Sequence, residues 1–465
     1  MAPLTSWVPL LALFCVAGLL SACAEAPAGG AQPDAAVSMP PADALSVDAA
    51  AVATEVPTGS TLGEAATASG RLHFERPDSV RGLYLNAWSA GSERRLTQLL
   101  ALADSTEINT FVIDIKDATG FVSHESAVAT AVEIGANEQR RIRNLRGLLE
   151  RLHAHGVYPI ARIVVVKDPL LIAARPDQAV QDTAGGVWID SKDFVWLNLW
   201  DRRNLDYHLE LAHEVAALGF PEIQWDYIRF PDAPQSDMAR AVFPGETGPR
   251  PDAVRAFLEA ARTDLQAIGV RSTADVFGVT TTFRRDVGIG QVWESFIDVV
   301  DAALPMVYPS HYWTGSFGFE HPNARPYEIV REAMADALQR SAAVPNAGEV
   351  IPWLQDFSLG QPRYGAPEVR AQIEAVHDAG IPHWILWNPG SRYTAEALRP
   401  EGGWQTEPLI SYAGEHITAA SRFALFERIE RERFVADSIA QARSNAARFD
   451  SAQATPADSV RAGGC

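Results

Sequence analysis

The chain is poor in cysteine and in basic residues. Each shortage excludes certain kinds of site and partner. It has 3 cysteines in 465 residues, so neither a disulfide framework nor a zinc site built from cysteines is expected. Its 39 basic residues are outnumbered by 58 acidic ones, which gives a net charge of −19. Such a charge argues against the basic surface with which proteins bind nucleic acid or an anionic membrane. We therefore expect a neutral or cationic partner, and no nucleic acid.

Three catalytic signatures are also missing. No His-x-x-His or His-Glu-x-x-His pattern occurs, so we predict neither a catalytic metal nor a cofactor. No Gly-x-Ser-x-Gly elbow occurs, which disfavours an esterase of the α/β-hydrolase kind. No glycine-rich dinucleotide turn follows the first predicted strand. The sequence therefore points away from these three enzyme classes.

The first residues predict an export signal followed by a tether. The apolar stretch from Val8 to Leu20 is too short to span a bilayer comfortably. It runs into Leu20-Ser-Ala-Cys23, which resembles the bacterial lipobox and implies lipidation of Cys23; an ordinary signal peptide cut nearby is the alternative. Residues 23–75 are rich in Ala, Pro, Gly, Ser and acidic residues and predict a flexible tether. After a signal peptide over 1–22, we expect a lipid anchor to the bacterial cell envelope, with the protein periplasmic or surface-exposed.

Residues 78–412 alternate between short apolar runs and helical patterns. The predicted strands are Gly82–Trp88, Asn109–Asp117, Val157–Lys167, Glu222–Phe230, Ser272–Gly278, Ala302–Tyr308, Val350–Phe357 and His383–Asn388. Apolar residues at helical spacing predict helices over 93–103, 142–153, 252–268 and 369–379. This α/β order predicts a closed (β/α)8 TIM-type barrel, with an open doubly wound sheet as the alternative. From about His416, within residues 413–465, the pattern predicts an amphipathic helix and then a disordered tail.

Polar and aromatic residues gather where the predicted strands end. In a barrel of parallel strands the chemistry lies at these positions. A ring of strand ends rich in tryptophan and carboxylate predicts a carbohydrate site. The predicted substrate-binding residues are Trp88, Asp114, Lys116, Tyr308, His311, Trp313, Trp353, Gln355, Asp356, Trp387 and Asn388.

The alternation of side chains along a strand selects the candidate catalytic residues. It directs Asp226 and Asp275 toward the barrel axis from neighbouring strands, and Trp225 and Tyr227 toward the helices. Strands about 4.8 Å apart can bring two carboxyls to the roughly 5.5 Å spacing of retaining glycosidases. Two like charges also raise one pKa, which provides an acid and a nucleophile. We predict Asp226 as nucleophile and Asp275 as general acid/base; a strand-end aspartate that only caps the following loop is the alternative for Asp226.

Two further aspartates are alternatives for the second catalytic role. These are Asp356 and Asp114. The same alternation directs both Asp114 and Lys116 toward the barrel axis. A charged pair in that position is either a structural ion pair or part of the site.

Several segments also match a known family in the right order. They are Arg81-Gly-Leu-Tyr-Leu, Val112-Ile-Asp-Ile-Lys-Asp, Trp225-Asp-Tyr-Ile-Arg-Phe-Pro, Ala274-Asp-Val-Phe-Gly, Pro305-Met-Val-Tyr-Pro-Ser-His-Tyr, Pro352-Trp-Leu-Gln-Asp-Phe and Trp384-Ile-Leu-Trp-Asn. Over residues 80–412 the chain resembles the putative glycoside hydrolase domain family, first catalogued as a domain of unknown function. The resemblance implies a TIM-type barrel of the glycosidase superfamily. In the similar α-galactosidase group, a strand-four Trp-Asp-Tyr-like run carries the nucleophile, which implies Asp226; that group's acid comes from strand six, and Leu304–Tyr308 has no carboxylate.

Two functions from different classes agree with these motifs. The first is a glycosidase that cleaves a poly- or oligosaccharide with two carboxylates. The second is a non-catalytic carbohydrate-binding lipoprotein that keeps the barrel and its aromatic residues. Asp226, Asp275 and Asp356 favour the first. A deacetylase is a third possibility, but it would need metal ligands that the sequence does not show. The sequence does not predict the sugar or the oligomeric state.

Overall fold

The computed structural model describes residues 71–432, 435, 438 and 439. The predicted signal peptide, Cys23 and most of the predicted tether lie outside these residues, as does most of the predicted C-terminal tail. No helix in the described part of the chain combines the length and apolar character needed to cross a bilayer.

In the described residues, nine strands form one sheet in which all pairings are parallel and which closes on itself. In spatial order the barrel contains β1 (Arg81–Leu85), β2 (Thr110–Lys116), β3 (Tyr158–Val164), β5 (Glu222–Asp226), β7 (Arg271–Phe277), β8 (Ala302–Met306), β9 (Glu349–Val350), β10 (Trp353–Gln355) and β11 (Trp384–Trp387). The short strands β9 and β10 both pair with β8 and share one barrel position. Eight positions therefore close the ring, and the predicted (β/α)8 barrel is confirmed.

The split between β9 and β10 follows from a proline. Pro352 has no N–H to donate to a neighbouring strand, so it interrupts the ladder. Just before it, Ile351 N donates to the carbonyl of Ala303 on β8, at 3.0 Å. The Pro352 carbonyl accepts from Ile385 N on β11, also at 3.0 Å. The seventh strand position thus still joins β8 to β11 and closes the barrel.

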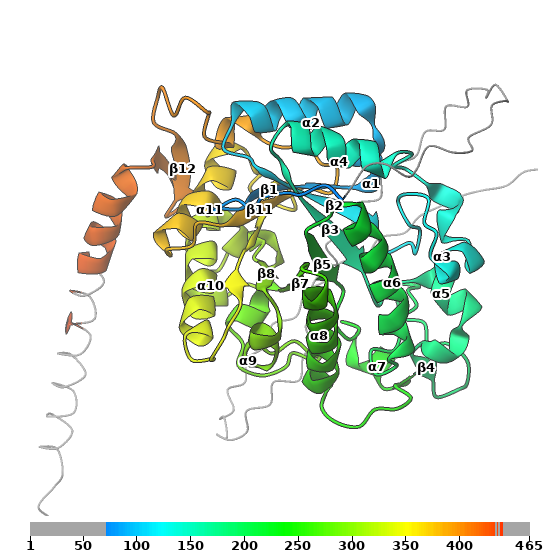
Figure 1. Ribbon diagram of the computed structural model, residues 1–465. Helices are drawn as coiled ribbons and strands as arrows, with labels where there is room; N and C mark the ends of the chain where they lie inside the picture. Colours follow the sequence, from blue (N-terminus) through cyan, green and yellow to red (C-terminus); the bar gives the residue numbers. More distant parts are fainter. Residues whose placement is uncertain (1–70, 433–434, 436–437, 440–465) are drawn as a thin grey trace, which may run out of the picture. The chain divides into compact units, whose positions relative to one another are not determined.

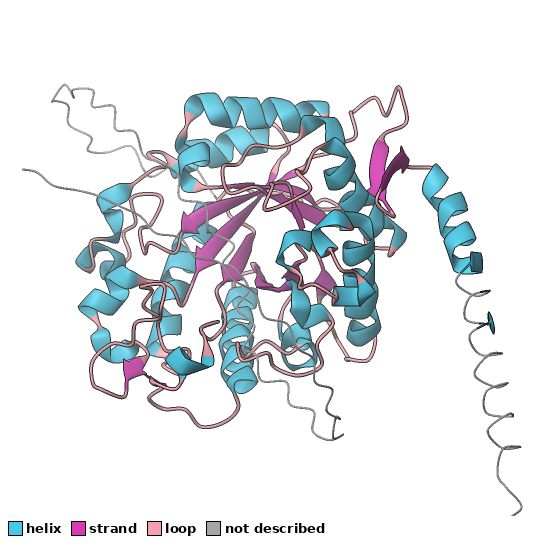
Figure 2. Ribbon diagram, turned by 180° about the vertical axis from the view of Figure 1, so that it is seen from behind, coloured by secondary structure: helices cyan, strands magenta, loops and turns pink. Residues whose placement is uncertain are grey.

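Helices surround the strands, as Figures 1 and 2 show. The longer ones are α2 (Glu93–Ser105), α4 (Leu145–Ala154), α6 (Arg203–Leu218), α8 (Arg250–Ala267), α10 (Pro326–Ser341) and α11 (Ala366–Asp378). The short ones, in the connecting segments, are α1 (Ala87–Gly91), α3 (Ala129–Glu133), α5 (Pro169–Ala174), α7 (Gln235–Met238) and α9 (Trp293–Phe296). The four predicted helices are confirmed, with ends that differ by a few residues. For example, α4 begins at Leu145 because the Asn144 side chain caps it by accepting from Gly147 N.

The core lies between the strands and the inner faces of these helices. Helix α2 buries Leu96, Leu99 and Leu100, and burial of one such side chain stabilises the fold by about 1.5–3 kcal/mol. On β5, the Trp225 ring packs edge-on against Phe257 of α8, with centroids 5.7 Å apart. Its Nε1 donates to Ser272 Oγ, at 2.9 Å. Trp225 therefore points toward the helices, as the alternation of side chains predicts.

Two small antiparallel pairs lie outside the barrel. In the loops after β3 and β5, β4 (Gln181–Asp182) pairs with β6 (Ala241–Val242). Near the C-terminus, β12 (Leu409–Tyr412) pairs with β13 (Glu415–Thr418). The helix predicted from about His416 is wrong in its start, because residues 421–432 are helical and His416 lies in β13. The turn at Ala413-Gly414 has positive φ at both residues, which suits a two-residue hairpin.

Candidate active site

Four neighbouring strands each contribute one charged side chain to a buried group inside the barrel. These residues are Asp114 on β2, Arg162 on β3, Asp226 on β5 and Asp275 on β7, and we call them the Arg162 cluster. None of the four is more than 4% exposed. Their strands are adjacent in the sheet, and in the β2–β3 register Arg162 is the partner of Asp114. The fold thus gathers residues that are up to 161 positions apart in the sequence.

One guanidinium contacts all three carboxyls of the cluster. Arg162 Nη1 donates to Asp114 Oδ1 at 2.6 Å. Arg162 Nε donates to Asp226 Oδ2 at 3.1 Å, and Nη2 donates to the same oxygen. The closest approach to Asp275 is 3.7 Å, between Nε and Oδ2. Because both oxygens lie near the same nitrogen, Oδ2 of Asp226 and Oδ2 of Asp275 are at most roughly 7 Å apart, so the two carboxyls are neighbours.

The surroundings of the carboxyls change their protonation. Burial, and then the charge of Asp226, raises the pKa of Asp275 well above its ordinary value. Asp275 Oδ1 accepts only from neutral donors, Gln224 Nε2 at 2.6 Å and Trp353 Nε1 at 2.7 Å. Burial also raises the pKa of Asp114 to about 6, although Arg162 and the Tyr84 hydroxyl oppose this shift. A site with carboxyls in different protonation states is suited to acid and base chemistry.

Aromatic rings enclose one side of the Arg162 cluster. Tyr84 and Trp387 stack with centroids 3.9 Å apart, and Trp353 meets Trp387 edge-on at 5.5 Å. The Arg162 guanidinium lies 5.2 Å from the Trp387 ring and 5.5 Å from the Tyr84 ring. Trp353 and Trp387, which the sequence predicts as sugar platforms, therefore lie inside the barrel next to the charged groups.

Backbone strain follows directly after Asp226. Tyr227 has a φ of 55°, which is unusual for a residue with a bulky side chain. Its N–H donates to Asp226 Oδ1. The Tyr227 ring lies 4.7 Å from Lys167 Nζ and 4.9 Å from the Arg229 guanidinium, among loops at the carboxyl ends of β3 and β5. The prediction that Tyr227 points toward the helices is therefore wrong, because this dihedral angle breaks the alternation.

Lys116 lies apart from the Arg162 cluster. A shift of register between Asp114 and Lys116 in the β2–β3 ladder changes the direction of its side chain. Its Nζ donates to the Val164 carbonyl at 2.8 Å and pairs with Asp168 Oδ2 at 2.9 Å, and both side chains of this pair are fully buried. Its charge also lowers the pKa of His208 on α6, where burial is the larger cause. The predicted inward direction is wrong, and Lys116 is partnered by Asp168 rather than Asp114.

The side chains of three other predicted residues stabilise loops at the strand ends. Gln355 Oε1 accepts from Ser310 N at 3.1 Å, and its Nε2 donates to the Phe357 carbonyl at 2.9 Å. Asp356 accepts from the backbone and the hydroxyl of Thr394, at 2.8 and 2.7 Å. Asn388 Nδ2 donates to the Asp356 carbonyl at 2.5 Å. A sugar contact by these three residues stays a prediction.

The remaining predicted residues lie in the segments after β1 and β8. The Trp88 side chain is 66% exposed, with the guanidinium of Arg141 3.6 Å above its ring. Trp313 is half-buried and meets the exposed Phe283 edge-on at 5.6 Å. His311 packs against the Tyr308 ring at 5.4 Å, and burial lowers its pKa to about 4. Trp88 and Trp313 thus have the exposure that a surface sugar contact needs, although that role too stays a prediction.

The raised pKa of Asp356 gives a testable dependence of stability on pH. Burial raises this pKa to about 6, so the folded protein keeps a proton that the unfolded chain releases near pH 4. The stabilisation is complete below pH 4 and is lost as the pH rises through 6. We expect the free energy of unfolding to fall over this interval, by at most about 3 kcal/mol from Asp356. Urea unfolding at pH 4, 5, 6 and 7 should show a smaller fall in Asp356→Asn. Equal falls in the variant, the exposed control Asp78→Asn and the wild type would contradict the prediction.

Two residues of the site, Arg162 and Tyr84, are not predicted from the sequence. A signal for Arg162 is present, because it is the only charged residue in the apolar run Tyr158–Val164. Burying an unpaired charge is costly, so a lone arginine inside a strand indicates carboxylate partners on neighbouring strands. The pattern of a single strand does not identify those partners.

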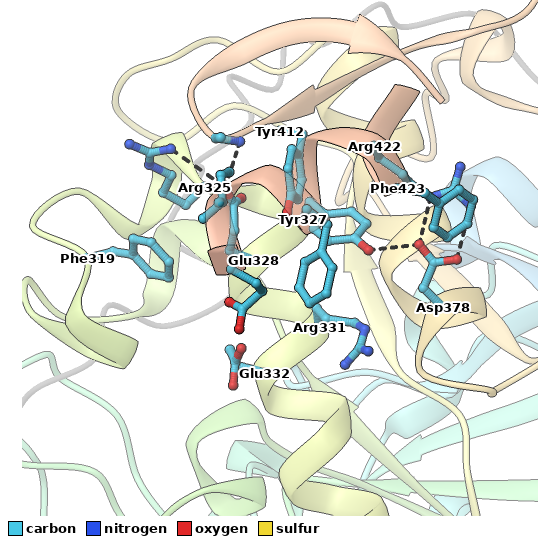
Figure 3. Close-up of a pocket in the computed structure, with 14 residues that line it drawn as sticks. Phe319, Arg325, Tyr327, Glu328, Arg331, Glu332, Asp378, Tyr412, Arg422 and Phe423 are labelled. Atoms are coloured by element: carbon cyan, nitrogen blue, oxygen red, sulfur yellow. Dashed lines mark hydrogen bonds and ion pairs between the residues drawn. The ribbon is translucent and has the colours of Figure 1, made fainter. Parts of the chain in front are cut away.

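A pocket of about 670 Å³ lies outside the barrel, lined by α10, the turn between β12 and β13, and residues from 422 to 430 (Figure 3). Here the Arg422 Nε and Nη2 donate to the two oxygens of Asp378 on α11, at 2.6 and 3.0 Å. The Tyr327 hydroxyl of α10 also donates to Asp378, at 2.7 Å. These bonds attach the C-terminal helix to the barrel, so we give Asp378 a structural role. The barrel interior is the better candidate site because there three carboxyls share one guanidinium.

The described part of the chain contains no evident metal site. Among its residues, no group of three or more His, Cys, Asp or Glu side chains is arranged to hold a metal ion.

Solved structures resemble parts of this chain. A hypothetical protein from Ruminiclostridium thermocellum is 37% identical, over 42% of this chain and 97% of its own, with a TM-score of 0.38. The PgaB (BpsB) glycoside hydrolase domain from Bordetella bronchiseptica is 12% identical, over 67% and 95%, with a TM-score of 0.48. The spore cortex-lytic enzyme SleL from Bacillus megaterium is 11% identical, over 69% and 73%, with a TM-score of 0.41. No curated protein is significantly similar to the chain.

The match to a protein family covers more of the chain. Residues 82–393 match the family described as "Putative glycosyl hydrolase domain". This match begins within β1, ends after β11 and includes all four residues of the Arg162 cluster. It therefore spans the barrel except Arg81 at the start of β1, and more than half of the chain.

Proposed function

Because the chain belongs to the putative glycosyl hydrolase domain family, we propose that its barrel cleaves a poly- or oligosaccharide at the Arg162 cluster. The observation that carries this proposal is the close pair of Asp226 and Asp275 inside the barrel. Both belong to strands that end at the same edge of the barrel, where enzymes of this architecture place their catalytic groups. Two carboxyls with different surroundings provide the acid and the nucleophile that glycoside hydrolysis needs.

We assign the nucleophile to Asp226 and the general acid/base to Asp275. In the first step Asp226 attacks the anomeric carbon, the glycosidic C–O bond breaks, and the leaving oxygen takes the proton of Asp275. In the second step the Asp275 carboxylate takes a proton from water, and the water oxygen displaces Asp226 from the anomeric carbon. The raised pKa of Asp275 supports its role as the initial acid.

The two alternatives for the acid role have less support. Asp114 Oδ1 accepts a hydrogen bond from Arg162 and its Oδ2 accepts one from Tyr84, so both oxygens already have a donor. Asp356 accepts two bonds from Thr394 that shape the loop after β11. Asp275 instead has one oxygen, Oδ2, with only the 3.7 Å contact to Arg162. That oxygen is the best placed to deliver a proton to a bound sugar.

Buried polar atoms support a role in sugar binding. Gln224 Oε1, Trp387 Nε1, His311 Nε2 and Trp313 Nε1 are buried and have no hydrogen-bond partner among the described residues. Buried polar atoms are nearly always hydrogen-bonded, so an unpaired set invites a ligand or water. Sugar hydroxyls both donate and accept, which makes them suitable partners for these four atoms.

The test is hydrolysis of a glycan panel by the full-length wild-type protein. Soluble and insoluble polysaccharides and their oligomers are incubated with the protein, and new reducing ends and products are measured by colorimetry and mass spectrometry. Release of shorter glycans from one member of the panel is the expected result. Binding in affinity electrophoresis without release would favour a carbohydrate-binding lipoprotein instead. Neither binding nor release across the panel would contradict both functions.

We further propose that residues 1–22 are a lipoprotein signal peptide and that Cys23 carries a lipid anchor at the bacterial cell envelope. The lipobox-like sequence before Cys23 supports this proposal. In a detergent phase-partition assay, the processed wild-type protein should enter the detergent phase and Cys23→Ala should not. Equal partitioning of the two proteins would exclude the anchor.

A further inference from the structure

The Arg162 cluster contains more carboxyls than cations. One guanidinium faces three carboxyl groups, so full ionisation would leave an excess of two negative charges in a buried space. Excess buried charge of one sign is costly, and a carboxyl responds by keeping its proton. At least one of the three carboxyls should therefore be neutral in the folded protein, and the contacts indicate which one.

Of the three carboxyls, Asp226 receives the most hydrogen bonds from the guanidinium of Arg162. Two nitrogens of Arg162 donate to its Oδ2, and the Tyr227 backbone N–H donates to its Oδ1. Hydrogen bonds from a charged donor are about twice as strong as neutral ones, and they favour the ionised form of the acceptor. Asp226 is therefore the carboxyl that Arg162 stabilises most as an anion.

Asp275 has only neutral hydrogen-bond donors. Gln224 and Trp353 both donate to its Oδ1. Its Oδ2 lies 3.7 Å from Arg162 Nε, which is too far for a good hydrogen bond. A proton on Oδ2 therefore breaks no hydrogen bond, and it removes the repulsion between Asp275 and Asp226.

We propose that Arg162 is a positioning residue that decides which carboxyl is the nucleophile: it holds Asp226 as the anion and leaves the proton on Asp275. The consequence for catalysis rests on the proposed function, because only a glycosidase uses the two states as nucleophile and acid. The protonation states themselves require no substrate.

Arginine is required because it serves two carboxyls at once. Its Nη1 binds Asp114 on one side while Nε and Nη2 bind Asp226 on the other. The other groups that face these carboxyls are the Tyr84 hydroxyl, which donates to Asp114, and the charge of Asp117, which acts on Asp114. The compact ammonium of a lysine lacks the planar fork of the guanidinium and would not serve both carboxyls in this geometry.

The experiment is a titration of the aspartate side chains in the full chain without substrate. Carboxyl carbons are labelled with ¹³C and observed by NMR from about pH 4 to 8, the interval in which ordinary aspartates are already ionised or become so. The spectra of Asp226→Asn and Asp275→Asn assign the two signals. In the wild type, Asp226 should be ionised and Asp275 protonated at pH 6.

Removing the guanidinium should make Asp226 easier to protonate. In Arg162→Met, the carboxyl of Asp226 loses its two bonds from a charged donor, so it should take up a proton at higher pH than in the wild type. If this variant does not fold, Arg162→Lys should still raise the titration of Asp114 or Asp226 by a measurable amount. Ionised Asp275 at pH 6 in the wild type, or unchanged titrations in a folded Arg162 variant, would overturn the inference.

The titration separates this inference from the proposed function. Predicted protonation states without hydrolysis of any glycan would keep the role of Arg162 and remove the glycosidase. Glycan hydrolysis with unchanged titrations in the variants would keep the enzyme and remove the role of Arg162.

Discussion

Replacing Asp226 with asparagine should lower the rate of glycoside hydrolysis by at least ~10⁴-fold, which corresponds to about 5.5 kcal/mol of transition-state stabilisation. Asparagine has nearly the same shape but cannot form the glycosyl ester, so the covalent route is closed. The substitution removes one of the anions around Arg162, while Asp114 still pairs with the guanidinium. We expect the fold and the glycan affinity to be kept, as measured by thermal unfolding and affinity electrophoresis.

A matched control for this variant is Asp301→Asn. Asp301 precedes β8 at the opposite end of the strand from the site, and its Oδ1 pairs with the guanidinium of Arg262 at 3.0 Å. The chemical change is the same, but the position is remote from the Arg162 cluster. We expect the control to hydrolyse glycans at close to the wild-type rate. A folded Asp226→Asn protein that keeps more than a tenth of the wild-type rate would exclude Asp226 as the nucleophile.

The second large effect is on stability. Lys116→Met should lower the free energy of unfolding by about 3–5 kcal/mol, because it leaves the Asp168 carboxylate buried without its partner. Both side chains of this pair are fully buried, and Lys116 also donates to the Val164 carbonyl. Urea unfolding at neutral pH measures the loss.

The double variant Lys116→Met with Asp168→Asn is the control for the lost charge pair. Asparagine keeps an oxygen for Leu171 N, which Asp168 Oδ1 accepts at the start of α5 at 2.9 Å. With both charges removed, we expect the double variant to be more stable than Lys116→Met alone. A Lys116→Met protein with unchanged stability and lost glycan affinity would instead support the predicted sugar contact of Lys116.

The barrel and two of its central residues could be predicted from the sequence. Eight apolar runs separated by helical patterns are a repeated signal, so errors in single elements do not change the fold class. The alternation of side chains also directs Asp226 and Asp275 into the barrel, where they lie in the structure. These successes depend on regular backbone geometry.

The wrong predictions of side-chain direction concern residues at which the regular backbone geometry is interrupted. A register shift after Asp114 redirects Lys116, and the positive φ of Tyr227 redirects its ring. Sequence alternation assumes an even pleat and does not show either irregularity. Arg162 is not predicted for a different reason, since its partners come from three other strands up to 113 residues away. Contacts between distant strands depend on the register of the whole barrel.

The proposed function requires that a glycosidic bond is cleaved between Asp226 and Asp275. A crystal structure of Asp226→Asn with an oligosaccharide that the wild type hydrolyses tests it most directly. We expect the glycosidic oxygen within hydrogen-bond distance of Asp275, and the anomeric carbon about 3–3.5 Å from the side chain at position 226. An oligosaccharide bound with its scissile bond out of reach of both carboxyls, for example in the pocket beside α10, would contradict it.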